Sequence, residues 1–571
     1  MSVVLSEHLP LLALAPDGVQ KLRGLILELA VRGKLVPQDP DDEPARELLR
    51  RIAKERMRLE AEGICKKSKV TPLEGEEDLP FALPHSWEWA PLGGLGVIGS
   101  SSRVHQKDWT DQGVPFYRAR EIVKLSQDGF VQNELFISKR LYESLAASGL
   151  VPVEDDLMVT GVGTIGVPYI VKAADRFYFK DASVLIFKNY HRLCADYIRI
   201  FMTSPYWVKK IHEKSMGTTV HTLTIVRANE VPVPLPPLAE QHRIVAKVDE
   251  LMALCDRLEA EQADAACAHA RLVETLLGTL TQSTDAADLA ANWQRLAEHF
   301  DTLFTTEGSI DALKQSILQL AVMGKLVPQD PNDEPASELL KQIALEQERL
   351  VAKGLLKKLK SLPPVDEADV PFALPNSWAW ARFPEVGQFG RGKSKHRPRN
   401  DPALFNPGIY PLVQTGEVAR AGTIVHEIHS KYSDVGLSQS KMWPKGTLCI
   451  TIAANIADTA ILGFDACFPD SVVGFVPSEL IEDSYYFLWF MKTAREELLK
   501  FAPSTAQKNI NLEILESVRI PLPPQSEMQR IVAKVDELMV LCDRLKTDLA
   551  TARQRQATLA DTLIELALEA A

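Results

Sequence analysis

The chain has 571 residues, of which 46% are hydrophobic and 25% charged, and its formal net charge is −12. This is the composition of an ordinary globular protein, and the length predicts three to five domains of about 100–200 residues each. The acidic balance alone argues against a nucleic-acid-binding protein. No run approaches the ~18 apolar residues of a membrane-spanning helix. The seven cysteines form no Cys-x-x-Cys pair, so we expect a cytoplasmic protein.

The first predicted elements are a helix over 19–31 and a charged helix over 44–62, joined by the phrase GKLVPQDPDDEP. A glycine ends the first helix, and Asp42 is the expected N-cap of the second. A polar linker then leads to a strand that begins within LPFALPHSWEWA.

The same opening returns 291 residues later. Residues 31–49 and 322–340 differ at only three of 19 positions, so helices are expected over 310–322 and 335–353. Asp333 is the corresponding expected N-cap, and Trp378 takes the place of Trp87.

Each half closes with PLPP followed by RIVAKVDELM-x-LCDRL, which starts at Arg243 and again at Arg530. Apolar residues then recur at spacings of four and three, which is typical of a coiled-coil seam. The predicted seams contain Ile244, Val248, Leu251, Cys255, Leu258, Ala265, Leu272 and Leu276, and Ile531, Val535, Leu538, Cys542, Leu545, Leu549, Ala552, Leu559, Leu563 and Leu566. Helices of roughly 45 residues would be about 65 Å long.

Two inserts, residues ~91–232 and ~382–519, lie inside this repeated frame and share no obvious identity. Short β-branched and aromatic runs broken by Gly, Pro, Asn and Asp predict compact mixed domains rich in β-structure. Residues 90–232 hold 17 basic and 14 acidic residues, residues 380–519 hold 15 of each, and the rest holds 32 and 47. The acidity therefore belongs to the frame, which leaves DNA binding open to the inserts.

In the first insert, the segment FYRAREI is expected to place two arginines on one strand face, and arginine is the commonest reader of guanine. A salt bridge to Glu121 or Asp111 is the competing interpretation. GVGTIG at 161–166 matches G-x-G-x-x-G, but VPYIV follows in place of a helix, so a hairpin turn is predicted, either purely structural or beside the DNA backbone. The DNA-contact candidates are Arg103, Lys107, Arg118, Arg120 and Thr164.

In the second insert, RGKSKHRPRN at 391–400 is the densest basic run. On an extended segment its odd-numbered cations would face one way, toward phosphates, although a solvated loop is the alternative. Glutamine can pair with adenine, so PLVQTGEV adds two further candidates. The candidates are Arg391, Lys393, Lys395, His396, Arg397, Arg399, Gln414 and Thr415.

A loop of small polar residues lies near the end of each insert, KSMGTTVHTLT from Lys214 and APSTAQKNINL from Ala502. Each is either a DNA contact or an ordinary surface turn. The candidates are Thr218, Thr219 and His221 in the first loop, and Thr505, Gln507 and Lys508 in the second. The sequence has no (Asn/Asp)-Pro-Pro-Tyr, Walker lysine, H-E-x-x-H or Cys/His cluster, so we expect neither catalysis nor a metal site.

Two unlike inserts, each preceded by Pro-x-Ser-Trp and followed by PLPP-x-x-E-x-x-RIVAKVDEL, resemble the specificity subunit of type I restriction–modification enzymes along essentially the whole chain. The resemblance implies an α+β fold with two mixed α/β target recognition domains. It also implies two long antiparallel coiled-coil helices and a pseudo-twofold duplication. Each domain would read half of a split, asymmetric DNA site.

The resemblance further implies partners: two modification subunits that bind S-adenosylmethionine and methylate adenine N6, and restriction subunits that use ATP and Mg²⁺. The chain itself would hold no cofactor. A coiled-coil adaptor with two protein-binding inserts is the alternative. Residues 283–307, which have no counterpart before the first repeat, are expected to add a helix. The expected domains are helical segment 1–78, recognition domain 79–233, long helix 234–282, connector and helical segment 283–369, recognition domain 370–520 and long helix 521–571.

Overall fold

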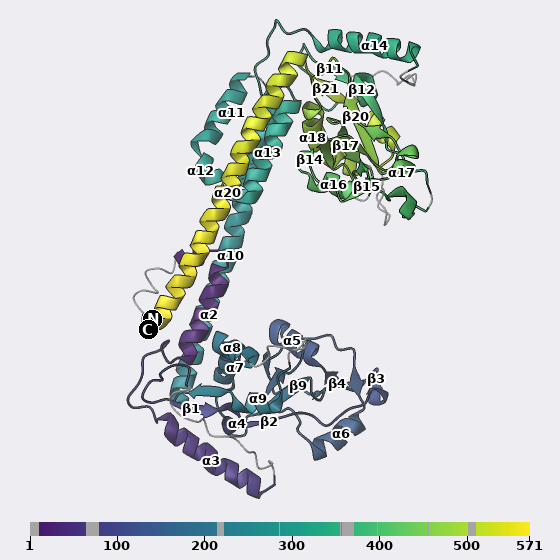
Figure 1. Cartoon of the computed structure of the whole chain (residues 1–571). Helices are drawn as coiled ribbons and strands as arrows, with labels where there is room; N and C mark the ends of the chain where they lie inside the picture. Colours follow the sequence, from purple (N-terminus) through teal and green to yellow (C-terminus); the bar gives the residue numbers. More distant parts are fainter. Residues whose placement is uncertain are drawn as a thin grey trace. The chain divides into compact units, whose positions relative to one another are not determined.

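The computed structural model describes residues 11–63, 79–213, 222–284, 286–354, 356, 370–396, 398–453, 456–500 and 510–570. The chain divides into two compact units (Figure 1). The first comprises residues 1–265 and 552–571, and the second comprises residues 266–551. None of the helices in the described ranges is both long and apolar enough to cross a membrane.

Each unit contains the predicted pair of opening helices. They are α2 (Gly18–Val31) and α3 (Ala45–Ala61) in the first unit, and α13 (Glu307–Val322) and α14 (Ala336–Ala352) in the second. α2 and α13 each stop before a glycine, Gly33 or Gly324, whose φ of 70° lies in the left-handed region that favours glycine.

The predicted caps of α3 and α14 are wrong. Pro44 and Pro335 occupy the N-cap positions. Asp42 Oδ2 instead lies 2.5 Å from Arg243 Nη2, and Asp333 Oδ2 lies 2.7 Å from Arg530 Nη2. A guanidinium offers charged donors, which bind a carboxylate more strongly than one backbone N–H does.

The first insert is closed by the antiparallel pair β1 (Glu88–Pro91) and β10 (Pro232–Leu235), so its two ends lie side by side. One sheet has the order β2–β9–β6–β7 (Val97–Gly99, Val184–Lys188, Leu157–Thr160, Pro168–Ile170). The other has the order β3–β5–β4–β8 (Trp109–Thr110, Phe136–Ile137, Val114–Tyr117, Tyr178–Phe179). The helices are α4 (Leu92–Leu95), α5 (Ala119–Asp128), α6 (Lys139–Ser148), α7 (Ala195–Thr203), α8 (Pro205–Glu213) and α9 (Ile225–Glu230).

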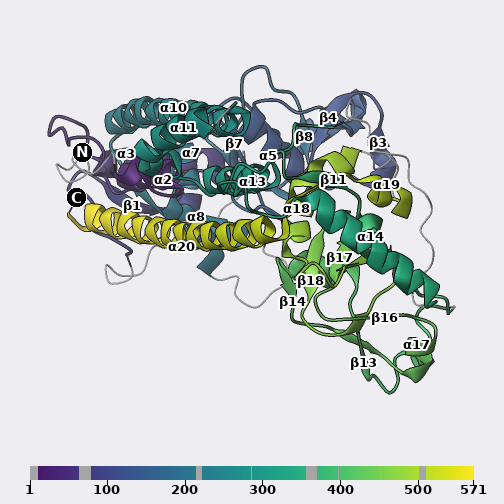
Figure 2. The ribbon, with the colours of Figure 1, turned by 90° about the horizontal axis from the view of Figure 1, so that it is seen from above.

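The second insert is closed in the same way by β11 (Ala379–Ala381) and β21 (Ile520–Leu522). One sheet has the order β12–β20–β17–β18–β14 (Gly387–Arg391, Val472–Pro477, Leu448–Thr451, Thr459–Leu462, Ile424–Val425). The other has the order β15–β13–β19–β16 (Ser430–Tyr432, Tyr410–Leu412, Ala466–Cys467, Met442–Trp443). The helices are α15 (Phe383–Val386), α16 (Thr415–Arg420), α17 (Asp434–Ser438), α18 (Tyr485–Lys500) and α19 (Leu512–Ser517), and α18 packs beside β18 (Figure 2).

The two inserts share a topology that their sequences do not reveal. The first strand of each pairs with a late strand, which pairs in turn with a hairpin: β2–β9–β6–β7 corresponds to β12–β20–β17–β18. In each second sheet one pair is parallel, β4 with β8 and β13 with β19. The prediction of compact mixed domains with substantial β-structure is confirmed.

The predicted long helices are α10 (Leu238–Gln282), with 45 residues, and α20 (Gln525–Ala570), with 46. Residues 238–265 of α10 belong to the first unit and residues 266–282 to the second. For α20 the order is reversed, because residues 525–551 belong to the second unit and residues 552–570 to the first. In each unit the local parts of both long helices join a core with α2 or α13.

The residues predicted to form the coiled-coil seam are buried or half-buried in the first part of each long helix, but several of them are exposed in the second part. Ile244, Val248 and Cys255 are buried, whereas Leu272 is 52% exposed and its neighbour Val273 is buried. The exposed members of the predicted seams are Ala265, Leu272, Ala552, Leu559 and Leu566. Residues buried in their place are Val273, Leu277, Leu280, Ala560 and Ala567. A straight helix drifts by about 20° per heptad, so the buried stripe moves to neighbouring residues.

The helix expected within residues 283–307 is present. It comprises α11 (Ala286–Glu298) and the single turn α12 (Phe300–Leu303). Leu296 and Leu303 pack with Val273 and Leu277 in the core of the second unit.

A buried polar joint ties the two segments that precede the first insert to the long helix that follows it. The Glu240 side chain is fully buried, and its carboxylate accepts hydrogen bonds from Trp87 Nε1 at 2.9 Å and Gln38 Nε2 at 2.6 Å. Gln38 comes from the repeated phrase and Trp87 from the Pro-x-Ser-Trp segment. The repeated motifs therefore meet at one carboxylate.

The second unit repeats this joint. Glu527, also fully buried, accepts hydrogen bonds from Trp378 Nε1 at 3.0 Å and Gln329 Nε2 at 2.5 Å. Burial raises the pKa of Glu240 and of Glu527, and the two hydrogen bonds offset this only in part. The repeated frame motifs thus make the same contacts in both units.

Candidate nucleic-acid interface

The two arginines of FYRAREI were predicted to lie on a strand face. This prediction is wrong, because β4 ends at Tyr117. Arg118 precedes α5 and Arg120 lies in its first turn, where both bind the carboxylate of Glu121. Arg118 donates from its backbone N and from Nη2, each at 2.8 Å, and Arg120 donates from Nε at 2.5 Å. The competing prediction of a salt bridge to Glu121 is confirmed. The R-A-R-E spacing puts this glutamate at the third helical position, from which it reaches back to the cap.

Arg118 and Arg120 contact a buried carboxylate on one side and an exposed carboxylate on the other. The side chain of Glu121 is 5% exposed, whereas that of Glu134, which also contacts Arg120, is 69% exposed. Glu134 lies 3.8 Å from Arg118 as well. Burial pushes the pKa of Glu121 up, but hydrogen bonds from Arg118 and Arg120 outweigh it and leave the pKa below its usual range.

The candidates Gln414 and Thr415 occupy the corresponding place in the second insert. Gln414 precedes α16 and Thr415 is its first residue. Glu417 takes the place of Glu121: its side chain is 8% exposed and accepts from the backbone N of Gln414 at 3.1 Å. His429 Nδ1 lies 3.1 Å from the same carboxylate. The two groups of predicted readers are therefore equivalent in topology, and the shared x-x-x-Glu spacing was a signal that could have shown it.

The basic run of the second insert contains two kinds of cation. Arg391 Nε donates to the carbonyl of Asp470 at 3.0 Å, and Arg399 Nη2 binds its two carboxylate oxygens at 3.0 and 2.9 Å. His396 Nε2 lies 2.7 Å from Asp401 Oδ2. Among the described residues of the run only Arg391 belongs to a strand, and for the loop that follows it the one-sided alternation of the odd-numbered cations stays a prediction.

Lys393 and Lys395 are exposed, and within the described ranges neither forms an ion pair. Ser440 Oγ donates to the Lys393 carbonyl at 2.9 Å, which brings Lys441 to the same place. Lys441 Nζ lies 3.5 Å from the ring centre of Trp443, and burial together with the nearby Lys393 charge lowers its pKa. Sequence reasoning missed Lys441, because this proximity arises from chain folding.

The GVGTIG segment forms the predicted hairpin between β6 and β7. Thr160 Oγ1 donates to the Thr164 carbonyl at 2.5 Å and accepts from Val167 N at 2.9 Å, while Thr164 is exposed. The second insert uses the same device, because Thr451 Oγ1 accepts from Asp458 N at 3.0 Å between β17 and β18.

Arg103 and Lys107 are exposed in the loop that follows β2, and Lys107 lies in a 3-10 turn. Tyr178 Oη accepts from Ser102 N at 2.9 Å and anchors this loop. The candidates outside the described residues are Thr218, Thr219, His221, Arg397, Thr505, Gln507 and Lys508.

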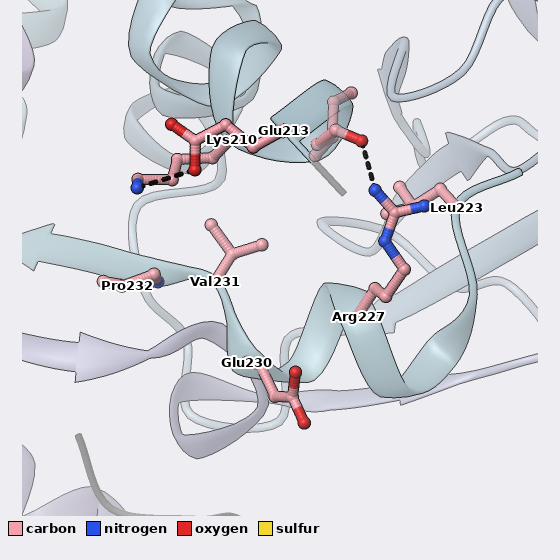
Figure 3. A pocket seen from close by; sticks show the side chains of 8 residues that line it. Lys210, Glu213, Leu223, Arg227, Glu230, Val231 and Pro232 are labelled. Atoms are coloured by element: carbon pink, nitrogen blue, oxygen red, sulfur yellow. Dashed lines mark hydrogen bonds and ion pairs between the residues drawn. The ribbon is translucent and has the colours of Figure 1, made fainter. Parts of the chain in front are cut away.

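A cavity of about 160 Å³ lies between α8 and α9 in the first unit (Figure 3). Arg227 donates to the carbonyls of Thr222 and Ile211, and Lys210 pairs with Glu213 at 2.9 Å. Two basic and two acidic side chains, Lys210, Arg227, Glu213 and Glu230, are part of the lining. Nowhere in the described ranges do three His, Cys, Asp or Glu side chains form a group that could hold a metal ion.

The family model described as the type I restriction modification DNA specificity domain matches residues 84–266 and 375–552. The chain is 37% identical to the type I restriction enzyme EcoAI specificity subunit of Escherichia coli, over 96% of this chain and 94% of that protein. It is 35% identical to the Escherichia coli EcoEI specificity subunit, over the same shares.

Among solved structures, the HsdS subunit from Thermoanaerobacter tengcongensis is 17% identical, with a TM-score of 0.41, over 86% of this chain and 98% of that one. The family model covers more than half of the chain in two copies, and the first relative matches it nearly end to end. The chain therefore belongs to the type I restriction–modification DNA specificity family.

Proposed function

We propose that this chain is the specificity subunit of a type I restriction–modification complex, in which each insert is a recognition domain that reads one half of a split, asymmetric DNA target. The observation that carries the proposal is that the two inserts share one topology but differ in the side chains at the positions proposed to read bases. Equivalent positions hold Arg118 in the first domain and Gln414 in the second. These side chains prefer guanine and adenine edges respectively.

The charge distribution supports DNA over a protein ligand for the inserts. The frame is acidic, whereas the first insert carries a net charge of +3 and the second has equal numbers of acidic and basic residues. Lys393 and Lys395 on one loop of the second insert and Lys441 on a neighbouring segment bring three lysines together. Such cations bind phosphates without reading the sequence, while the arginine and glutamine readers supply selectivity. The adaptor alternative accounts for the long helices but not for these cations.

The chain supplies recognition, and its partners supply the chemistry. Two modification subunits bind S-adenosylmethionine and methylate adenine N6 within the target, and restriction subunits use ATP and Mg²⁺. The long helices dock the modification subunits and set the number of unspecified base pairs between the half-sites. The complex works in the cytoplasm, where it meets chromosomal and incoming DNA.

Mapping methylated adenines in host cells with and without this chain tests the proposal. The expected result is one split motif that is methylated only when the chain is present. An unchanged methylation map in cells that hold active modification subunits would refute the proposal. Sequence-selective duplex binding by the purified complex would exclude the adaptor.

A further inference from the structure

We propose that Glu121 and Glu417 are positioning residues: each is a fixed carboxylate that holds the backbone at the reader position of its recognition domain, and Glu121 also holds the guanidinium groups of Arg118 and Arg120, so that the variable reader side chains face the DNA. In the first domain the exposed Glu134 contacts the solvent-facing side of Arg118 and Arg120, and DNA displaces it on binding. This inference rests on the proposed function and assigns a role to Glu121, which sequence reasoning names only as a competing salt-bridge partner.

The contacts of Glu121 are those of a fixed support. Its carboxylate accepts from Arg118 N and Nη2 at 2.8 Å and from Arg120 Nε at 2.5 Å, and its side chain is 5% exposed. An arginine has five N–H donors in a rigid fork, so bonds to Glu121 leave other donors of each guanidinium available. The side chains of Arg118 and Arg120 are 26% and 55% exposed. Both are therefore anchored on one side and open on the other.

Glu134 has the opposite character. Its side chain is 69% exposed, it binds Arg120 Nη2, and it lies 3.8 Å from Arg118 Nη2. Exposed ion pairs of this kind are weak, because water and salt screen them. A phosphate or a guanine edge can displace such a partner at little cost, while the buried Glu121 contacts persist. Glu134 thus occupies the position of the DNA in the free protein.

The second domain keeps the support and changes the reader. Glu417, 8% exposed, accepts from Gln414 N at 3.1 Å and lies 3.1 Å from His429 Nδ1. On the outer side, Gln414 Nε2 donates to Ser430 Oγ at 3.4 Å. A buried glutamate therefore recurs at the same place in two domains with no obvious sequence identity, next to an arginine pair in one and a glutamine in the other. A fixed support beneath an exchangeable reader explains this combination.

The test compares three charge-neutralising variants, E121Q, E134Q and E143Q, in the purified complex of the full chain with its modification subunits. Glu143 is an exposed residue of α6 and gives a matched control for loss of one negative charge. The readout is the ratio of affinities for the mapped target duplex and for a duplex with the first half-site scrambled. Melting curves of each variant report its folded fraction.

We expect E121Q to lower this ratio by about 5- to 100-fold, the range for loss of one aligned base contact, without weakening binding to the scrambled duplex. We expect E134Q to raise target affinity by about two- to fivefold relative to E143Q, because no ion pair must be broken. An E121Q ratio within twofold of the wild-type ratio would overturn the positioning role. Equal effects of E134Q and E143Q would overturn the exchange.

A second variant tests the other part of the inference, that the reader side chains can be exchanged above a constant carboxylate. The triple substitution Arg118→Gln, Ala119→Thr and Arg120→Gly keeps Glu121 and installs the second domain's reader sequence. The methylated motif is expected to change in the first half-site only, and an unchanged motif would overturn the inference. If the wild-type complex itself shows no preference for any duplex, the proposed function fails. If the wild-type complex prefers the target duplex and E121Q has the same affinity ratio, only the positioning role is refuted.

Discussion

At the scale of single residues, a cation's partners decide its role better than its place in a charged run. Arg391 and Arg399 are both committed to Asp470, one to its carbonyl and the other to its carboxylate. Lys393 and Lys395 are exposed on the same loop. Phosphate contacts of such lysines can be measured through counterion release, because each contact contributes about 0.9 to the slope of log affinity against log salt concentration.

We therefore expect K393A/K395A to reduce that slope for a non-target duplex by about 1–2, since up to two phosphate contacts are lost. The measurement is a binding titration between about 50 and 200 mM salt. K445A, which removes an exposed lysine of the same domain, is the control and should leave the slope unchanged. Equal slopes for the double variant and K445A would remove the lysines from the interface.

Asp42 and Asp41 give a second comparison between neighbouring residues. The Asp42 side chain is 8% exposed and pairs with Arg243, whereas Asp41 is exposed and the second copy has Asn332 in its place. Asp42→Ala should cost about 1–2 kcal/mol, because a charged hydrogen-bonded pair is lost near the surface. Faster amide exchange in residues 36–44, by roughly tenfold, would report this cost as local opening. Asp41→Ala should leave exchange unchanged, and the same rate for both variants would contradict the assignment.

At the scale of elements, sequence patterns predicted what local rules control. Repeated phrases and apolar spacing placed α2, α3, α13, α14 and the long helices within four residues of their bounds. Pro168 and the β-branched tail after GVGTIG correctly predicted a hairpin. The common topology of the inserts stayed hidden, because strand order depends on long-range pairing that many sequences satisfy. Charged contacts between distant residues stayed hidden for the same reason: Asp42 pairs with Arg243 some 200 positions away, whereas the local salt bridge to Glu121 was predicted.

The joints add a pH dependence whose sign follows from burial. The pKa of Glu240 and of Glu527 is raised in the folded state, so the folded protein binds more protons than the unfolded chain in the window just above pH 4.5. This contribution to stability is fully present below that window and is lost as the pH rises through the folded-state pKa. The melting temperature of the wild type should therefore fall as the pH rises through this window. In E240Q/E527Q this fall should be smaller, because the two titrating carboxyls are absent.

Melting curves of the wild type and of the double variant between pH 4.5 and 7 measure this difference. E250Q/E537Q alters two exposed glutamates on the same long helices and is the matched control. Parallel pH profiles for all three proteins would show that the joint carboxylates do not titrate in the window.

At the scale of the whole molecule, each insert leaves and re-enters the frame at a single antiparallel strand pair. Ala379 pairs with Leu522 and Ala381 with Ile520, so the ends of residues 382–519 lie next to each other. The joint residues Trp378 and Glu527 lie outside this range and stay with the frame. The strand pair can therefore be kept when an insert is replaced, provided that the new insert also supplies the face that packs on the frame, as α18 does on α13.

Replacing residues 382–519 by the second insert of a relative such as the EcoAI subunit should thus change one half of the methylated motif and keep the other. The first domain retains its readers, and the frame retains both joints, so assembly with the modification subunits should persist. Methylome sequencing measures the motif, and co-purification measures assembly. A motif unchanged in both halves would refute two-domain reading. A change in both halves would mean that the domains do not read independently, because the first domain is identical in the two proteins.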